Sequence, residues 1–289
     1  MADVECVWPV GAILGEGPVW SASEGAVWFV DIKAPAIHRF HPESGARRTW
    51  TAPARVGFVA PTRDGRWIAG LKTGLHRFNP ETGNFTLLHV VEPHAPNNRL
   101  NDGFVDSEGF LWFGSMDDNE EEPSGALYQL GAEGCIRRDP GYVVTNGPAE
   151  SPDGRVLYHT DTLAGVIYAF DRARSGALSN KRIFARLQPG AYPDGPIVDS
   201  EGCVWSGVFG GWGLKRYSPR GEMLSEIRLP CSAVTKAAFA GDDLRTLYIT
   251  TAHVALSAEE RTSQPLAGGL FRARIEVPGL PQGSISHGI

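Results

Sequence analysis

One short pattern recurs along the whole of this chain. In each copy an apolar stretch runs into an Asp-Gly or Glu-Gly pair, and a second apolar stretch with an aromatic residue follows. The glycines of five copies stand 40 to 48 residues apart, at Gly25, Gly65, Gly109, Gly154 and Gly202. Because Gly in such a pair adopts positive φ without strain, each copy is typical of a β-hairpin. A sixth, looser copy occupies residues 237–250.

A second motif alternates with the hairpins and supplies a further strand to each unit. It reads Gly74-Leu75-His76-Arg77-Phe78 in one unit and Gly213-Leu214-Lys215-Arg216-Tyr217 in another. Six units of about 45 residues predict an all-β fold, a single domain over residues 1–289 that forms a six-bladed β-propeller around a central channel. We expect about fifteen N-terminal residues to add a strand to the last blade. Only residues 251–267 leave room for a helix.

One aromatic residue recurs at the same place in each unit, and we expect this series to pack between neighbouring blades. Its members are Trp28, Trp67, Trp112, Tyr158, Trp205 and Tyr248. His38, His41 and His76 fall in the outer-strand and turn motifs and are predicted to lie at the surface. His159 and His253 lie on or just after inner-blade strands, where we expect hydrogen-bonded core residues.

Charge and cysteine content argue against several classes of protein. The formal net charge is −6, from 27 Lys and Arg against 33 Asp and Glu, so no basic face for nucleic acid is expected. Four cysteines stand far apart without a Cys-x-x-Cys pair, which argues against a zinc site and a disulfide framework. Neither an export signal nor an apolar run long enough for a membrane helix is recognisable. These features predict a cytoplasmic protein without nucleic-acid or membrane partners, as a monomer or weak homo-oligomer.

The repeat also predicts which residues face the channel at one level. Eight or nine residues before the turn glycines stand Glu16, Gly57, Asn101, Asn146 and Asp194, and Thr235 or Lys236 comes near that place in the last copy. Two carboxylates and two carboxamides that meet at one end of a channel match the ligands of a divalent cation. Glu-Gly-Pro, Asn-Gly-Pro and Asp-Gly-Pro are also ordinary turn sequences, in which the side chain binds its own backbone. Spacing alone leaves both interpretations open.

Other motifs of catalysis are missing from the sequence. Neither HExxH, GxSxG nor GxxxxGK[ST] occurs, so zincin, serine-hydrolase and P-loop chemistry have no support. The acidic run at residues 117–122 follows the third aromatic strand. We expect it to be a solvated loop, at a position from which it could fold over the channel as a lid.

Several segments resemble the senescence-marker-protein, gluconolactonase and luciferin-regenerating-enzyme family of six-bladed propellers. They follow the family's order over nearly the whole chain, as Leu14-Gly15-Glu16-Gly17-Pro18-Val19-Trp20, Asn98-Arg99-Leu100-Asn101-Asp102-Gly103, Thr145-Asn146-Gly147-Pro148, Ser151-Pro152-Asp153-Gly154, Tyr192-Pro193-Asp194-Gly195 and Pro265-Leu266-Ala267-Gly268-Gly269-Leu270-Phe271. The chain resembles the bacterial sugar-lactonase branch of this family, and within that branch it resembles a pentonolactonase such as xylonolactonase.

The resemblance implies a metal site and a substrate site on the predicted ring. One divalent ion would be bound by Glu16, Asn146 and Asp194. Oxygen ligands without thiolate or imidazole favour Ca²⁺, Mg²⁺, Mn²⁺ or Fe²⁺ over Zn²⁺. Substrate contacts are implied for three residues of one motif and one of the lid loop, namely Arg99, Asn101, Asp102 and Asn119. At this last position many members carry a Glu, so Asn119 departs from the family pattern.

The implied activity is metal-dependent hydrolysis of a sugar lactone to the aldonic acid in sugar catabolism. A lactone is a cyclic ester, and its hydrolysis needs a polarised carbonyl and an activated water, which a bound metal supplies. Asp194 is the residue expected to take the proton of that water. Two alternatives stay open: a paraoxonase-type hydrolase of aryl esters and lactones, which would need an apolar channel mouth, and a non-catalytic calcium-binding propeller.

Overall fold

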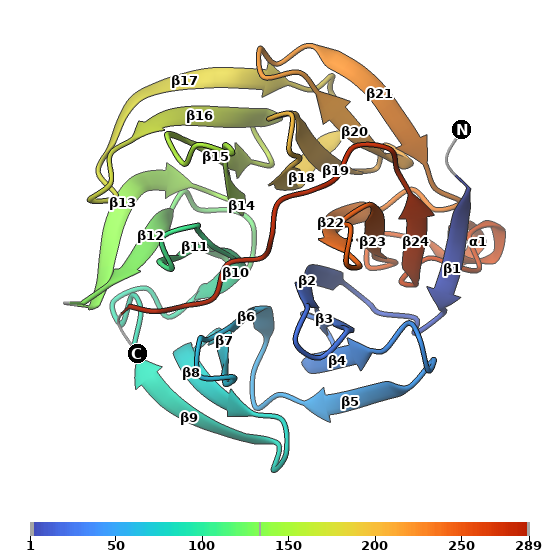
Figure 1. Cartoon of the computed structure of the whole chain (residues 1–289), viewed down its shortest axis with the longest axis horizontal. Helices are drawn as coiled ribbons and strands as arrows, with labels where there is room; N and C mark the ends of the chain where they lie inside the picture. The colour runs from blue at the N-terminus through green and yellow to red at the C-terminus, as the bar shows by residue number, and fades with distance from the viewer. Residues whose placement is uncertain (1–2, 133, 288–289) are drawn as a thin grey trace.

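Six four-stranded sheets are arranged in a ring around a central channel (Figure 1), in a computed structural model that describes residues 3–132 and 134–287. Neighbouring strands of every sheet pair antiparallel, as in β2 with β3 and in β3 with β4. This arrangement confirms the predicted all-β six-bladed propeller. Each blade has four strands.

The first five blades follow one another along the chain, each beginning with its strand at the channel. Blade 1 consists of β2 (Gly15–Ser21), β3 (Ala26–Asp31), β4 (Ala36–Phe40) and β5 (Arg47–Thr51). Blade 2 consists of β6 (Val56–Pro61), β7 (Trp67–Leu71), β8 (Gly74–Asn79) and β9 (Asn84–His89). Blade 3 consists of β10 (Asn98–Val105), β11 (Leu111–Asp117), β12 (Gly125–Gly131) and β13 (Gly134–Tyr142).

Blades 4 and 5 have the same plan. Blade 4 consists of β14 (Thr145–Glu150), β15 (Val156–Asp161), β16 (Val166–Arg172) and β17 (Leu178–Arg186). Blade 5 consists of β18 (Tyr192–Val198), β19 (Val204–Phe209), β20 (Gly213–Tyr217) and β21 (Met223–Arg228).

Blade 6 joins the two ends of the chain. From the channel outwards it consists of β22 (Val234–Ala240), β23 (Thr246–Thr251), β24 (Leu270–Arg274) and β1 (Val4–Trp8). Cys6 pairs with Phe271, and Arg272 Nη2 lies 2.5 Å from Glu5 Oε2. The N-terminal strand therefore closes the ring, as predicted. The one helix of the described residues, α1 (Ala258–Ser263), lies between β23 and β24, within the stretch where the sequence left room for it.

The recurring aromatic residues pack between blades, which confirms their predicted role. Trp28 of blade 1 and Trp67 of blade 2 are almost fully buried, with ring centroids 4.4 Å apart. Tyr248 of blade 6 meets Phe40 of blade 1 at a centroid distance of 6.2 Å. Trp112, Tyr158 and Trp205 share hydrophobic clusters with residues of the following blade. Aromatic contacts of this kind stabilise the ring beyond the area that they bury.

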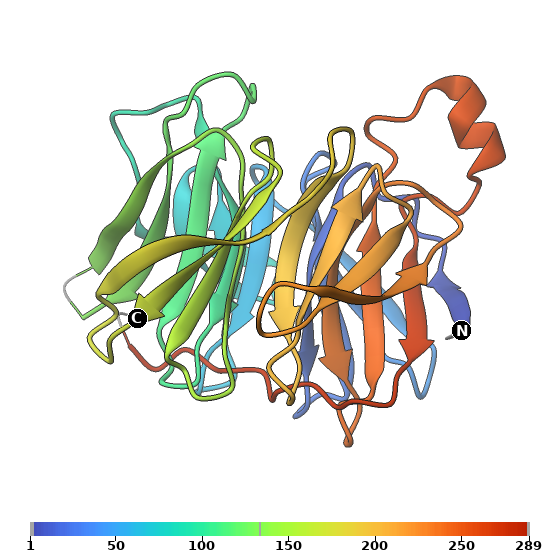
Figure 2. The same ribbon diagram turned by 90° about the horizontal axis from the view of Figure 1, so that it is seen from above.

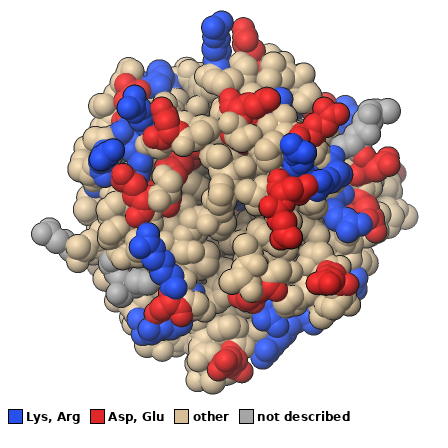
Figure 3. All heavy atoms as spheres, viewed as in Figure 1, with Lys and Arg blue, Asp and Glu red and all other residues tan. Residues whose placement is uncertain are grey.

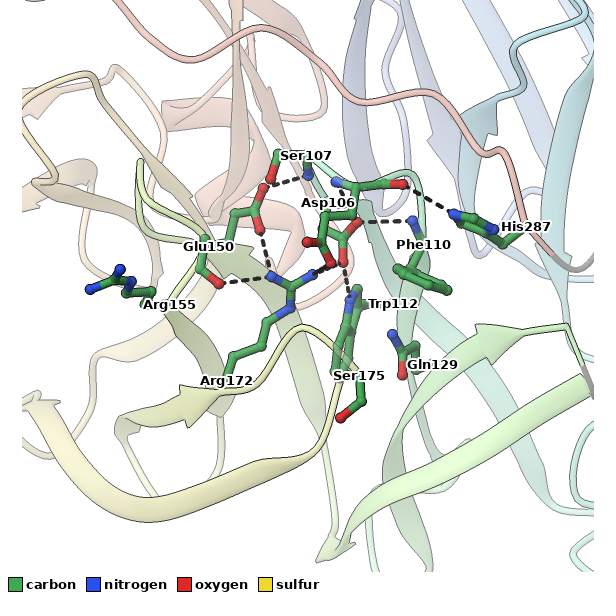
Figure 4. Close-up of polar contacts among 12 residues, drawn as sticks. Asp106, Ser107, Phe110, Trp112, Gln129, Glu150, Arg155, Arg172, Ser175 and His287 are labelled. Carbon is green, nitrogen blue, oxygen red and sulfur yellow. Dashed lines mark hydrogen bonds and ion pairs between the residues drawn. The ribbon is translucent and has the colours of Figure 1, made fainter.

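The two ends of the channel differ. Residues 275–287 cross one end, where Gly279 bridges to Asp199 and Ile285 to Thr62 (Figures 1 and 2). Beneath this segment lies a cavity of about 350 Å³ with mainly apolar walls. On this face charged side chains gather around the rim, and uncharged atoms surround a central hollow (Figure 3). Helix α1 and the taller loops stand on the opposite face (Figure 2), at the end where the predicted ring lies.

Two further features of the described residues concern the cysteines and the helix. All four cysteines are free, so no disulfide framework is present. No helix in the described ranges is both long and apolar enough to cross a membrane.

His38 and His76 are buried, so their predicted surface position is wrong. His38 packs against Phe29 and Trp8 at ring-centroid distances of 4.8 and 5.4 Å, and its Nδ1 lies 2.9 Å from Thr49 Oγ1. His76 Nδ1 lies 3.1 Å from the carbonyl oxygen of Gly74. Both histidines belong to the third strand of a blade, and that strand is covered by its neighbours. The motif indicates which strand carries each histidine but not that neighbouring strands cover it.

His159 is buried as predicted but has no hydrogen bond. Its ring meets Tyr142 edge-on at a centroid distance of 4.9 Å, and neither ring nitrogen has a partner among the described residues. Burial lowers the pKa of His159 to about 3. An unfolded histidine titrates near pH 6.5, so below that pH the unfolded chain gains a proton that the folded chain does not take up. His159 therefore costs stability as the pH falls.

We expect His159→Leu to make the protein less sensitive to acid. Between pH 7 and pH 5 the variant should lose about 2 kcal/mol less unfolding free energy than the wild type, because the proton uptake of one unfolded histidine is removed. Urea denaturation at the two pH values measures this difference. His94→Leu, at an exposed loop position, is the control. Equal pH dependence in His159→Leu and the wild type would contradict the assignment.

Candidate active site

Each of the six inner strands shifts its pairing register at the same level. The shifts lie between Glu16 and Val19, Val56 and Phe58, Leu100 and Gly103, Asn146 and Ala149, Pro193 and Pro196, and Val234 and Ala237. Such a bulge re-aims the side chains of the residues within it. The six positions that the repeat predicted to share one level all lie in or beside these bulges. At Gly57 a Cβ atom would lie 2.0 Å from the carbonyl oxygen of Asn101, so this position must be Gly.

Glu16 and Asp194 are buried and in contact. The Gly17 N–H donates to Glu16 Oε2 at 2.9 Å, and the Gly195 N–H donates to Asp194 Oδ1 at 2.8 Å. Both interpretations that the sequence left open therefore apply. Each side chain binds the backbone of its own turn, and the two acids also lie together in the ring. The two carboxyl groups also hydrogen-bond with each other. Burial, together with the repulsion among Glu16, Asp194 and the nearby Asp102, raises the pKa of both carboxyl groups.

The two asparagines of the ring form a chain of hydrogen bonds. Asn101 Nδ2 donates to Asn146 Oδ1 at 2.9 Å and to the carbonyl oxygen of Thr145 at 2.5 Å. Asn146 Nδ2 donates to Thr162 Oγ1 at 2.9 Å. Because its Nδ2 is held by Thr162, Asn146 keeps its carbonyl oxygen directed into the ring. Thr162 was not predicted from the sequence, since nothing in the repeat marks the turn that carries it.

Asp102 is paired with Lys236 across the ring. Lys236 Nζ lies 2.6 and 2.7 Å from the two carboxylate oxygens, and both side chains are buried. Backbone N–H groups of Gly103 and Gly147 donate to the same carboxylate at 2.8 and 2.9 Å. Both oxygens of Asp102 are thus occupied by the protein itself, and its predicted substrate contact stays a prediction. The sequence placed Lys236 near the ring but assigned it no role.

Arg99 links the ring to the loop that follows β11. Its Nη1 donates to Asn101 Oδ1 at 2.5 Å, and its Nε donates to Asp118 Oδ1 at 3.0 Å. The Asp117 carboxylate accepts the N–H groups of residues 119, 121 and 122 and is buried. The prediction of a solvated loop is therefore wrong for Asp117 and Asp118. Asp117 fixes the turn through the backbone amides, and Asp118 pairs with Arg99. Asn119 is exposed on this turn, and its contact with substrate stays a prediction.

The donor set of the ring fits a divalent cation. Lys236 is already bound to Asp102, so no cationic side chain among the described residues pairs with Glu16 or Asp194. Two buried carboxyl groups in contact, with raised pKa values, need a positive charge to ionise together. Within the described ranges no group of three or more His, Cys, Asp or Glu is arranged as metal ligands. The predicted set differs from such a group because its third member, Asn146, is a carboxamide.

Comparisons with known proteins identify the family of the chain. The model of the SMP-30/Gluconolactonase/LRE-like region matches residues 14–253. The chain belongs to this family. The match includes all the predicted site residues and confirms the resemblance drawn from the sequence motifs.

The similar proteins cover almost the whole chain. A 6-deoxy-6-sulfogluconolactonase of Pseudomonas putida is 37% identical over 280 residues, 96% of each chain. An L-arabinolactonase of Azospirillum brasilense is 35% identical over 273 residues, 92% of this chain and 90% of the relative. The crystal structure of a calcium-binding protein, regucalcin, from Agrobacterium tumefaciens has a TM-score of 0.95 at 26% identity, over 99% and 98% of the two chains.

Lys236→Met should destabilise the protein strongly. The substitution removes the one side-chain partner that Asp102 has among the described residues and leaves a buried carboxylate, so we expect a loss of about 3–5 kcal/mol in unfolding free energy. The double variant Asp102→Asn/Lys236→Met buries neither charge and should recover part of the loss. Urea denaturation of both variants tests this, with the exposed Arg155→Met as control. A single variant as stable as the control would contradict the role of the pair.

Proposed function

We propose that this lactonase hydrolyses an aldonolactone to the aldonic acid with one divalent metal ion bound by Glu16, Asn146 and Asp194. The buried contact between Glu16 and Asp194, with no cationic partner among the described residues, carries the proposal. Membership of the family and the two lactonases among the relatives support the reaction class. The proposed substrates are pentono- and gluconolactones such as xylonolactone.

The ligand set limits the metal and what it does. Carboxylate and carboxamide oxygens favour Ca²⁺, Mn²⁺, Mg²⁺ or Fe²⁺, with Zn²⁺ less favoured. The bound ion would polarise the lactone carbonyl and lower the pKa of the attacking water. A calcium-binding protein among the structural neighbours supports an oxygen-ligand site.

The side chains of the ring have separate roles in the proposed reaction. Asp194 takes the proton of the attacking water, and Glu16 balances the positive charge of the ion. Arg99 and Asn101 are hydrogen-bonded to each other and buried, so their positions are fixed. The guanidinium of Arg99 offers donors to the hydroxyl groups or the ester of the substrate, whereas Asn101, whose two amide hydrogens are already bound, offers its Oδ1 as an acceptor. A site that uses such donors discriminates against substrates without hydroxyl groups, because buried polar groups would be left unpaired. Asp102 and Asn119 are further proposed contacts.

The cellular setting is also a proposal. Four free cysteines fit a reducing compartment, and we place the protein in the cytoplasm. We infer a monomer or weak homo-oligomer that acts alone on a small sugar lactone.

One observation favours the second candidate, a hydrolase of aryl esters and lactones. Four exposed apolar side chains occupy the loops and strand ends of blades 4 to 6 on the face of the ring: Leu163, Tyr192, Trp212 and Val254. An aryl group could pack against such residues. The buried polar pair Arg99 and Asn101 favours a polyhydroxylated substrate, which is why the sugar lactone is preferred.

Metal depletion tests the proposed function. The purified protein, stripped with a chelator, is given pentonic and hexonic γ- and δ-lactones and aryl esters while acid release is followed. We expect hydrolysis of sugar lactones to fall to the background rate and to return on titration with divalent ions. Activity on aryl esters alone would favour the second candidate. Failure to hydrolyse any ester with any ion would contradict catalysis by this site.

Asp194→Asn should abolish turnover while leaving the propeller folded. The amide keeps an oxygen for the metal but cannot accept the proton of water, so kcat should fall by about 10²–10⁴-fold. Circular dichroism and thermal unfolding check that the fold is intact. Asp153→Asn, at an exposed turn of the opposite face, is the matched control. Wild-type kcat in Asp194→Asn would remove this residue from the mechanism.

A further inference from the structure

Four basic side chains gather beside the ring, at the same end of blades 1 to 3. Lys33 follows β3, Arg55 precedes β6, Lys72 follows β7 and Arg99 belongs to β10. We call these four residues the cationic cluster. They come from three successive blades, so the fold and not a local run of sequence brings them together. The cluster stands out because the whole chain carries a net charge of −6.

Three members of the cluster share a single carboxylate. Asp118 forms ion pairs with Arg55, with Lys72 at 3.0 Å and with Arg99 at 3.0 Å. Only 9% of the Asp118 side chain is exposed, whereas 36% of the Arg55 side chain and 36% of the Lys72 side chain remain exposed. One negative charge cannot balance three positive charges. Arg55 and Lys72 therefore keep unsatisfied donors and positive charge toward the solvent.

Nearby acids other than Asp118 form no ion pair with the cluster among the described residues. The Asp31 carboxylate accepts the N–H groups of residues 13, 14, 33 and 34, and the Asp117 carboxylate is likewise held by backbone amides. Glu120 is the remaining acid whose charge acts on both Lys33 and Arg99. Partial burial and the charges of Arg55 and Arg99 lower the pKa of Lys33, which reflects crowding among the cations. Asp31 and Asp117 keep their negative charges but form no ion pair with the cluster among the described residues, so Asp118 and Glu120 are the acids that act on its cations.

Arg99 connects the cationic cluster to the proposed substrate position. It is the cluster member that contacts Asn101 of the ring, at 2.5 Å, while Asp118 connects it to Arg55 and Lys72. A lactone held at Arg99 and Asn101 would extend its substituent past the rim of blades 1 to 3. We infer that the substrate is a sugar lactone with an anionic substituent away from the ester, such as a phosphate, sulfonate or carboxylate. This inference rests on the proposed function.

A pair of substrates that differ in one charged group, a phosphate, tests the inference. We compare glucono-δ-lactone with 6-phosphoglucono-δ-lactone, using the metal-loaded protein at about 20 mM and about 500 mM NaCl. At low salt, kcat/KM should be at least about tenfold higher for the phosphorylated lactone, and high salt should reduce the preference because exposed charges are screened. Isothermal titration calorimetry with 6-phosphogluconate and gluconate gives the same comparison without turnover.

Lys72 is the residue to vary, because its charge faces solvent and it does not contact the ring. Lys72→Gln should lower the ratio of kcat/KM for the charged to the neutral lactone by about fivefold, and Lys72→Arg should restore it. Arg155→Gln, at an exposed position of the opposite face, is the control and should leave the ratio unchanged. Equal kcat/KM for both lactones, or a ratio that Lys72→Gln does not move, would overturn the inference while the proposed function stands. Hydrolysis of neither lactone would overturn the proposed function itself.

Discussion

The candidate site depends on the bulge that every inner strand forms at one level of the channel. In a regular strand neighbouring side chains point to opposite faces, so adjacent residues rarely serve one site. Here Asn101 reaches Asn146 of the next blade, while the adjacent Asp102 reaches Lys236 of blade 6. The bulge also requires small residues beside the acids. A Cβ atom at Gly195 would lie 2.6 Å from Lys236 Cδ and 2.8 Å from Asp102 Oδ2.

The ring assembled in this way is electrostatically unbalanced, and the imbalance points to a ligand. Three carboxyl groups are buried together, and Lys236 compensates one of them. Burying Glu16 and Asp194 without a counter-charge costs free energy, which the raised pKa values of both groups express. A chain under selection for stability alone would replace such a pair with neutral residues. The pair therefore fits the cation site proposed for the ring.

The sequence predicted the features that repeat and missed those that occur once. Six hairpins with regular spacing were enough for the propeller, the aromatic contacts and the common level of Glu16, Asn146 and Asp194. Lys236 and Asp118 could not be assigned roles, because each depends on a partner far along the chain, 134 residues away for Lys236 and Asp102. His38 and His76 were placed at the surface because a motif shows which strand a residue belongs to, but not which face another blade covers.

The six blades share the geometry of their inner strands, and they differ in the loops around the ring, where differences in substrate specificity would arise. The inner strands share one geometry, but the loops above them differ in chemistry, with basic residues over blades 1 to 3 and exposed apolar residues over blades 4 to 6. Loops tolerate such variation because they carry few of the contacts that close the ring. When a substrate is held at the ring by its ester, its substituent contacts either the basic or the apolar side of the rim. If the proposed function holds, the polarity of that side, more than the ring itself, would decide which lactone is preferred.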